Sequence, residues 1–504
     1  MGQLKSLAKD TAIYGVSSIL GKTLNWLLTP LFTYTLATTG EYGIITNLYA
    51  YVALAIVILT FGMETGFFRF ANRKDEYDPM TVYSTTLLSV GSVVLVFLVL
   101  ILAFLQPLTR AFVQSIGAEI PESYLLMMIL VLCMDAFSSI PFAYLRYTKR
   151  PLRFAGLKML FIGLYILFCL FFLLLCPYLD GKYPWLVSWF YRPDFQVGYI
   201  LIANLLATAI QTGCLLPELL GFKYRFDKDL LKTMLHYSLP LLVLGVAGIL
   251  SQTIDKILFP ILYPDKEAAA NELGIYGACF KIAVVMVMFT QAFRYAYEPF
   301  IFAKNKSNDN KRAYSEAMKY FVIFGLFIFL GVMFYMDVLK YFVKWTYYDG
   351  LSVVSIVMMG ELFFGVYFNL SLWYKLTDKT HWGAIFSVIG CAVVIVLNIL
   401  FIPQYGYIAC AWASFIGNLI IMLLSYFIGQ KQYKIDYDLR SLFLYFGLAI
   451  VLFGVSEWVQ IDILGLRLAF RTGLLAVYLT VLFKRDLPLS EIPYVGKYFT
   501  DKKT

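Results

Sequence analysis

The sequence contains little charge, little histidine and no organised cysteine. Of its 504 residues, 14% are charged and only two are histidine, whereas 61% are hydrophobic. Soluble domains are about one quarter charged and about half apolar. The seven cysteines form no C-x-x-C pair, and a transition-metal site needs clustered cysteine or histidine. The composition therefore excludes an ordinary soluble domain, and we expect no metal and no cofactor.

Long apolar runs dominate the chain instead. Each contains about 20 residues or more, which is enough to cross a hydrocarbon core about 30 Å thick. We count about fourteen, which predicts an all-α polytopic membrane protein. The predicted spans lie near residues 11–36, 42–67, 81–105, 122–145, 154–176, 196–220, 234–262, 273–300, 320–342, 351–374, 381–402, 407–429, 441–460 and 466–482.

The formal charge of +9 is distributed unevenly between alternate loops. Loops on one side of the predicted membrane hold roughly four times as many lysines and arginines as loops on the other side. Because basic loops face the cytoplasm, both termini are predicted to be cytoplasmic. The positive charge is thus a topology signal, and we expect no nucleic-acid partner.

Signals of enzymatic chemistry are weak. The predicted outer loops are short, no P-loop is present, and the D-x-D at Asp436-Tyr437-Asp438 lies in a predicted cytoplasmic loop without a nucleotide-binding domain. A membrane enzyme such as a polymerase, a ligase or a glycosyltransferase is therefore a less favoured alternative to a transporter. A scaffold for a biosynthetic complex stays open as an added role.

Two short segments occur twice. GEYGIITNLYAY from Gly40 is similar to NELGIYGACFKI from Asn271, and GYILIANLL from Gly198 is similar to GYIACAWAS from Gly406. Such parallel repeats are typical of transporters built from two related halves. We predict a six-helix N-terminal lobe in residues 1–222, a six-helix C-terminal lobe in 223–432, and two further helices with a cytoplasmic tail in 433–504.

Helix-breaking residues lie in the first two spans and in the seventh. They include Pro30, Gly62, Gly66 and Pro240. Membrane helices tolerate such residues where neighbours or cavity water satisfy the freed backbone groups. These residues have two equally good interpretations. They either bend the helices for alternating access or allow small residues to pack closely.

Polar residues in the first span point to a cavity. A charge inside a membrane helix costs roughly 2.5–3.5 kcal/mol on insertion scales, so it is kept where it meets water, a partner or a substrate. Lys22 and Asn25 share one helix face. Lys22 is predicted to face the cavity, with a buried pair to Glu64 or Asp135 as the alternative. Those two carboxylates are predicted near the cytoplasmic ends of their helices, as surface charges or as ion-coupling groups.

The seventh and eighth spans carry the other candidates. In the seventh span, Gln252, Asp255 and Lys256 share a face, and Asp255 and Lys256 either line the cavity or extend to the membrane surface. In the eighth span, Gln291, Arg294 and Glu298 share a stripe, whereas Lys281 points elsewhere around the helix. Arg294 either pairs with Glu298 or faces an anion.

Together these residues predict a cavity for an anion. The passenger expected is a diphosphate or an acidic sugar, since lysine and arginine bind phosphate well. Carboxylates in the spans are candidates for coupling to H⁺ or Na⁺. The predicted cavity residues are Lys22, Asn25, Gln252, Asp255, Lys256, Lys281, Gln291 and Arg294, and the coupling candidates are Glu64, Asp135, Asp255 and Glu298.

One segment resembles a known family. VLNILFIPQYGYIACAWASFIGN contains N-x-x-x-I-P-x-Y-G at Asn398, Pro403, Tyr405 and Gly406. This pattern resembles the polysaccharide flippases of the multidrug/oligosaccharidyl-lipid/polysaccharide (MOP) exporter superfamily, which includes the multidrug and toxin extrusion (MATE) transporters. The segment YGVSSILGKTLNWLLTPLFTYTL, followed by EYGIITNLYAY, is similar to the opening of that family.

The resemblance implies two six-helix lobes around a cationic cavity, in the inner membrane of a bacterium. It implies the flipping of undecaprenyl-diphosphate-linked oligosaccharides for O-antigen, capsule or exopolysaccharide synthesis, with a polysaccharide polymerase complex as a candidate partner. A multidrug or cation antiporter of the same superfamily is the alternative. Cationic drugs favour acidic, aromatic cavities, so the cations within the spans argue against it.

Overall fold

The computed structural model describes residues 19–304, 310–377 and 379–487, and every regular element in these ranges is a helix. Residues 19–26 are helical. The labelled helices are α2 (Leu28–Thr35), α3 (Thr39–Thr60), α4 (Met63–Ala71), α5 (Pro79–Ala103), α6 (Leu105–Ile116), α7 (Glu122–Tyr147), α8 (Pro151–Leu170), η1 (Phe171–Leu175), α9 (Cys176–Lys182), α10 (Pro184–Val187), α11 (Gln196–Gly213), α12 (Leu216–Leu219), α13 (Lys228–Leu262), α14 (Lys266–Lys304), α15 (Asn310–Phe334), α16 (Met336–Leu339), η2 (Lys340–Phe342), η3 (Trp345–Leu351), α17 (Ser352–Leu370), α18 (Leu372–Leu376), α19 (His381–Tyr405), α20 (Tyr407–Gln432), α21 (Leu439–Trp458) and α22 (Leu464–Arg485).

Twelve described helices are long and apolar enough to cross a membrane. The predicted all-α, polytopic fold class is therefore confirmed, with the number of spans approximate. Of the two other predicted spans, the first begins before the described residues, and the sixth corresponds to the 18-residue helix α11. Local signals place several helix starts. Asp78, for example, caps α5 by accepting a hydrogen bond from the Thr81 N–H (3.0 Å), and Pro79 follows it as the first helical residue.

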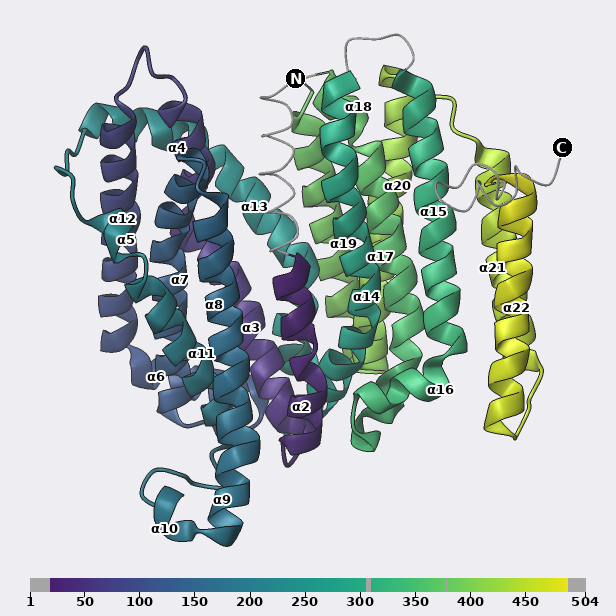
Figure 1. Ribbon diagram of the computed structural model, residues 1–504, viewed down its shortest axis with the longest axis horizontal. Coiled ribbons are helices and arrows are strands. Elements are labelled where there is room, and N and C mark those ends of the chain that lie inside the picture. The colour runs from purple at the N-terminus through teal and green to yellow at the C-terminus, as the bar shows by residue number, and fades with distance from the viewer. Residues whose placement is uncertain (1–18, 305–309, 378, 488–504) are drawn as a thin grey trace, which may run out of the picture.

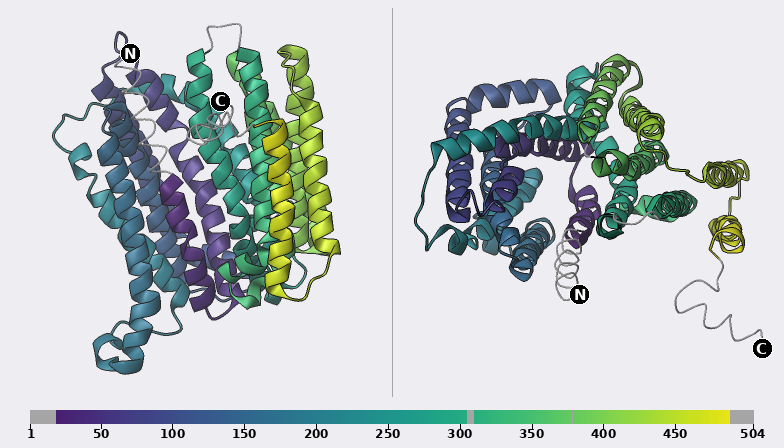
Figure 2. Two further views of the ribbon diagram at one scale, coloured as in Figure 1. Left: turned by 45° about the vertical axis from the view of Figure 1, so that its right-hand side comes forward. Right: turned by 90° about the horizontal axis from the view of Figure 1, so that it is seen from above.

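The helices form two groups that lie side by side (Figure 1). We call the helices up to α11 the N-lobe and helices α13–α20 the C-lobe. The 35-residue α13 spans about 50 Å at 1.5 Å per residue, so it must tilt, and it crosses from the N-lobe to the C-lobe. Viewed from above, α21 and α22 lie at the edge of the C-lobe, away from the N-lobe (Figure 2).

Two of the predicted bends are present. The helical hydrogen-bond pattern is interrupted at Leu27, because Pro30 has no N–H to donate to the Trp26 carbonyl. The second span is broken between α3 and α4, where Phe61 and Gly62 have φ angles of 34° and 71°. In contrast, α13 stays helical through Pro240.

The first sequence repeat is also a structural contact. Gly43 of α3 packs on α14, and Gly274 of α14 packs on α3, so closely that a β-carbon on Gly43 would overlap the Ala270 carbonyl. A β-carbon on Gly274 would likewise overlap the carbonyl of Thr39. The Thr39 hydroxyl lies 3.0 Å from Asn271 Oδ1 in the same contact. The two equivalent segments therefore join the lobes where α3 and α14 begin, by the small-residue packing common in membranes.

Polar contacts hold α22 on α15 and on the short helix α16 that follows it. Near one end, the Lys319 ammonium pairs with Asp486 (2.9 Å), and near the other Arg471 pairs with Asp337 (2.9 Å). Between them, the buried Tyr478 hydroxyl donates to the Ile323 carbonyl (2.8 Å). These bonds attach the last two helices to the C-lobe, so both are expected to move with it.

Candidate functional site

A cavity of about 430 Å³ lies between the lobes. We call its two sides the N-lobe wall and the C-lobe wall. The N-lobe wall consists of Asn25, Thr29, Phe32, Tyr42, Ile45, Thr46, Tyr49, Ala50, Val52, Val131, Asp135, Phe161, Tyr165 and Asn204. The C-lobe wall consists of Thr253, Lys256, Gly277, Phe280, Lys281 and Val284.

The C-lobe wall presents two lysines from adjacent helices. Lys281 of α14 reaches the cavity, and no acceptor or carboxylate pairs with its ammonium among the residues that the structure describes. Its backbone carbonyl accepts a hydrogen bond from Trp26 Nε1 (2.6 Å). The sequence predicts Lys281 as a cavity residue on another side of the helix than Gln291 and Arg294, and neither of those two residues lines the cavity. The tilt of α13 across α14 brings Lys256 and Lys281 to the same wall, although their spacing in sequence does not show this.

Lys256 is held more tightly than Lys281. Its Nζ lies 2.9 Å from Asp255 Oδ2 and 4.3 Å from the centroid of the Phe280 ring. Asp255 is buried and also accepts a hydrogen bond from the Tyr276 hydroxyl (2.7 Å). The Asp255 charge is thus neutralised within the C-lobe, and Lys281 is the less restrained cation of this wall.

The N-lobe wall is polar but carries a single charged residue, Asp135. Asp135 lies in the middle of α7, which runs from Glu122 to Tyr147, so its predicted place near a helix end is wrong. The short distance in sequence between Asp135 and the basic loop after α7 did not predict its depth in the helix, because α7 continues for three turns beyond Asp135. Beside it, the Asn204 amide donates to the Tyr49 hydroxyl (2.7 Å).

The first described helix, residues 19–26, packs against α14 at the boundary between the lobes, which we call the seam. Lys22 Nζ donates to Gln291 Oε1 (2.8 Å), and Trp26 stacks on Phe342 with ring centroids 4.3 Å apart. Neither Glu64 nor Asp135 pairs with Lys22 in the described part of the chain. Lys22 and Gln291 therefore lie at the seam, while their neighbour Asn25 lines the cavity.

The remaining predicted residues lie outside the two walls. Arg294 is exposed, with its guanidinium 4.5 Å from the centroid of the Phe368 ring, and Gln252 is exposed on α13. Glu64 forms an ion pair with Arg146. The side chain of Glu298 lies outside the described residues. The sequence prediction grouped these residues because they share one face of a helix. In the packed bundle, that face does not point into the cavity.

Sequence reasoning missed Tyr49, Asn204 and Tyr165. Asn204 lies within the repeated segment that begins at Gly198, and an amide inside an apolar span is itself a signal. The aromatic residues gave no such signal, because 18% of the chain is aromatic and most such residues pack in the core.

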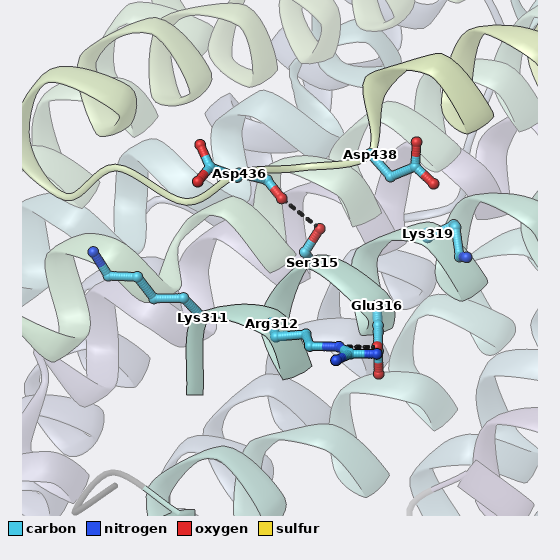
Figure 3. A pocket seen from close by; sticks show the side chains of 7 residues that line it. All are labelled: Lys311, Arg312, Ser315, Glu316, Lys319, Asp436 and Asp438. Atoms are coloured by element: carbon cyan, nitrogen blue, oxygen red, sulfur yellow. Dashed lines mark hydrogen bonds and ion pairs between the residues drawn. The ribbon is translucent and has the colours of Figure 1, made fainter. Parts of the chain in front are cut away.

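The D-x-D segment belongs to a separate surface pocket of about 410 Å³. Its carboxylates, from Asp436 and Asp438, point away from one another (Figure 3). The Asp436 carbonyl accepts a hydrogen bond from the Ser315 hydroxyl (2.8 Å), and Asp438 caps α21 by accepting one from the Ser441 N–H (3.1 Å). Both residues therefore have structural roles where α21 begins.

This arrangement of two helical lobes around a central cavity defines the class. It is the fold of MOP-superfamily transporters. The structure is similar to "Lipid II flippase MurJ, inward closed conformation", with a TM-score of 0.72 and 15% identity over 94% of this chain and 99% of that one. It is also similar to an inward-facing multidrug resistance MATE family transporter of the MOP superfamily, with a TM-score of 0.63 and 14% identity over 81% and 94% of the two chains.

The family is shown by the sequence. Residues 7–302, more than half of the chain, match the model of the polysaccharide biosynthesis protein family. The chain belongs to this family, and its twelve described membrane-length helices make it a multi-pass membrane protein. No curated protein matches it.

Proposed function

We propose that this transporter flips polyprenyl-diphosphate-linked oligosaccharide repeat units from the cytoplasmic to the outer leaflet of a bacterial inner membrane. The units would serve O-antigen, capsule or exopolysaccharide synthesis. One observation carries the proposal. Lys281 enters a cavity between the lobes without a carboxylate partner among the described residues. A cation at membrane depth is costly, and a diphosphate repays that cost by charge-assisted hydrogen bonds.

The transport step follows from the two-lobe architecture. The lobes touch where α3 and α14 begin, at the end opposite the basic loops, while a cavity lies between them. With the basic loops and both termini in the cytoplasm, the head group enters from the cytoplasmic side and the polyprenyl tail remains in lipid. Separation of the Gly43 and Gly274 contact then opens the cavity to the outer leaflet.

An ion gradient is a suitable energy source for this cycle. Of the coupling candidates, Glu64 is paired with Arg146 and Asp255 with Lys256, whereas Asp135 faces the cavity. We assign coupling to H⁺ or Na⁺ to Asp135. A polysaccharide polymerase complex that consumes the flipped unit is the expected partner at the outer face. The multidrug-antiporter alternative places a cationic drug beside Lys256 and Lys281, where like charges repel.

Purified protein in proteoliposomes tests the proposal. The substrate is undecaprenyl diphosphate linked to an oligosaccharide, and its arrival in the opposite leaflet is measured by accessibility to a membrane-impermeant lectin. Lys281→Ala should remove flipping, and Lys281→Arg should retain part of it. Lys311→Ala is the matched control, because that lysine lies over the Tyr433 ring outside the cavity. Wild-type flipping by Lys281→Ala would overturn the proposal.

A further inference from the structure

The two walls of the cavity differ in chemistry, and the difference indicates which sugar is carried. We infer that the N-lobe wall is a saccharide subsite that accepts a neutral or amino sugar next to the diphosphate and disfavours a uronic acid. This inference rests on the proposed function and narrows its substrate class. The argument comes from the aromatic rings, the fixed polar groups and the charge of the N-lobe wall.

The aromatic surface suits the apolar face of a pyranose. Phe161 and Tyr165, one turn apart on α8, have ring centroids 6.0 Å apart and planes inclined by 12°. Both residues line the cavity. Ring faces carry negative potential, so they attract the weakly positive C–H groups that a sugar presents on one face. The C-lobe wall has a single aromatic residue, Phe280, and its ring already lies beside the Lys256 ammonium.

The polar groups beside these rings have fixed positions. Asn204 is 5% exposed, and its amide donates to the Tyr49 hydroxyl (2.7 Å) while its Oδ1 accepts from Thr208 (3.3 Å). Because the amide is held from both ends, the Asn204 side chain fixes the position of the Tyr49 oxygen beside the rings. Preorganised amide and phenol groups next to ring faces are the combination that recognises a sugar hydroxyl.

The charge of the N-lobe wall selects among sugars. Asp135 is the single charged residue of this wall. Lys158 of α8 is not part of the wall, and its ammonium lies 4.0 Å from the centroid of the Phe142 ring. A uronate carboxylate beside Asp135 would meet a like charge, whereas a hydroxyl, an acetamido group or an ammonium would meet an acceptor.

The C-lobe wall fixes the direction of the head group. Lys256 and Lys281 attract the diphosphate, so the first sugar extends toward the opposite wall. The inference departs from the expectation from sequence, which named a diphosphate or an acidic sugar as the passenger. Cations on one wall and a carboxylate on the other suit a substrate with separate anionic and neutral parts.

Binding to the full-length protein in nanodiscs tests this subsite. The probes are undecaprenyl diphosphate alone and the same lipid carrying N-acetylglucosamine or glucuronic acid. We expect the N-acetylglucosamine probe to bind more tightly than the bare diphosphate. The affinity of the glucuronic acid probe should be lower than that of the N-acetylglucosamine probe by a factor of about ten or more. Equal binding of the two sugar probes would overturn the inference.

Two variants identify the residues responsible. Asn204→Leu should remove the gain in affinity that N-acetylglucosamine adds over the bare diphosphate. Asp135→Asn should remove discrimination against glucuronic acid. Gln211→Leu is the matched control on α11, because the buried Gln211 amide donates to the Leu157 carbonyl (3.1 Å) and does not line the cavity. Equal effects of Asn204→Leu and Gln211→Leu would refute the assignment.

The outcomes also separate this inference from the function on which it rests. If Lys281→Ala leaves binding of the bare diphosphate intact, the proposed function fails. If Lys281→Ala weakens that binding but the sugar probes bind alike, only the saccharide subsite fails. Thermal unfolding of each variant in the same nanodiscs identifies any that do not fold.

Discussion

The two walls of the central cavity come from lobes with similar sequence segments but present opposite chemistry. The C-lobe wall contains Lys256 and Lys281, and the N-lobe wall contains Asp135 among aromatic, hydroxyl and amide groups. The contact between Gly43 and Gly274 is instead nearly symmetric. The two repeats therefore share the packing that joins the lobes, while the residues that line the cavity differ between the lobes.

The largest effect is expected from reversing the charge of the C-lobe wall. Lys281→Glu should reduce flipping by about 100-fold or more, because it places a carboxylate where the diphosphate is expected and leaves Lys256 tied to Asp255. Asp135→Lys on the opposite wall should be less damaging. The lectin-accessibility assay measures both. If the two reversals impair flipping equally, the walls do not differ in function.

A second large effect is expected at the symmetric contact. Gly43→Val or Gly274→Val should prevent α3 and α14 from approaching, since even one β-carbon overlaps the facing backbone. The lobes would then remain apart at this end. A disulfide between Thr39→Cys and Asn271→Cys reports the closed contact, because those side chains lie 3.0 Å apart.

That crosslink should form in the parent protein and fail in either valine variant. Gly163→Val is the control, as no atom lies within 4 Å of a β-carbon at that position. Efficient crosslinking in Gly43→Val would show that the contact tolerates separation and does not gate the cavity. Replacing the exposed Cys214 with serine removes a competing thiol.

The fold could be predicted because apolar length and repetition are local properties of the sequence. The break near Pro30 and the one at Gly62 follow from backbone chemistry in the same way. The cavity could be predicted only in part. Of the predicted cavity residues, Asn25, Lys256 and Lys281 line it and the exposed Arg294 does not, whereas Asp135 lines it although it was expected near a helix end.

The errors have a common physical cause. Helical spacing shows which residues share a face but not where that face points, since tilt and packing decide this. Arg294 was expected to line the cavity but is exposed outside it, whereas the oblique path of α13 brings Lys256 to the same wall as Lys281. The Asn204–Tyr49 bond joins residues 155 positions apart and has no counterpart in local spacing.

A moderate effect is expected from neutralising the N-lobe wall. Asp135→Asn should lower gradient-driven flipping by about tenfold, a typical size for coupling between two sites, while flipping without a gradient persists. Proteoliposomes with and without an imposed H⁺ or Na⁺ gradient measure the difference. Glu64→Gln is the control, because Glu64 is paired with Arg146 away from the cavity. Full gradient stimulation in Asp135→Asn would remove Asp135 as the coupling group.

The smallest effect is expected behind the C-lobe wall. Tyr276→Phe removes the hydroxyl that donates to the buried Asp255, and a hydrogen bond to a charged group contributes about 1.5–3 kcal/mol. Tyr407→Phe is the neighbouring control, because the Tyr407 hydroxyl donates to a neutral carbonyl, that of Asp349 (3.1 Å), and should cost less. Denaturant unfolding in detergent compares the two losses of stability.

The flipping rate of Tyr276→Phe then shows whether Lys256 contributes to transport in addition to Lys281. If Asp255 only anchors Lys256, the weakened anchor should leave flipping nearly unchanged, because Lys281 supplies the less restrained positive charge. A loss of flipping as large as that of Lys281→Ala, with stability retained, would instead make the Asp255–Lys256 pair part of the transport site. The C-lobe wall would then act through both lysines, and the contrast between the walls would depend on the buried carboxylate as well as on the cations.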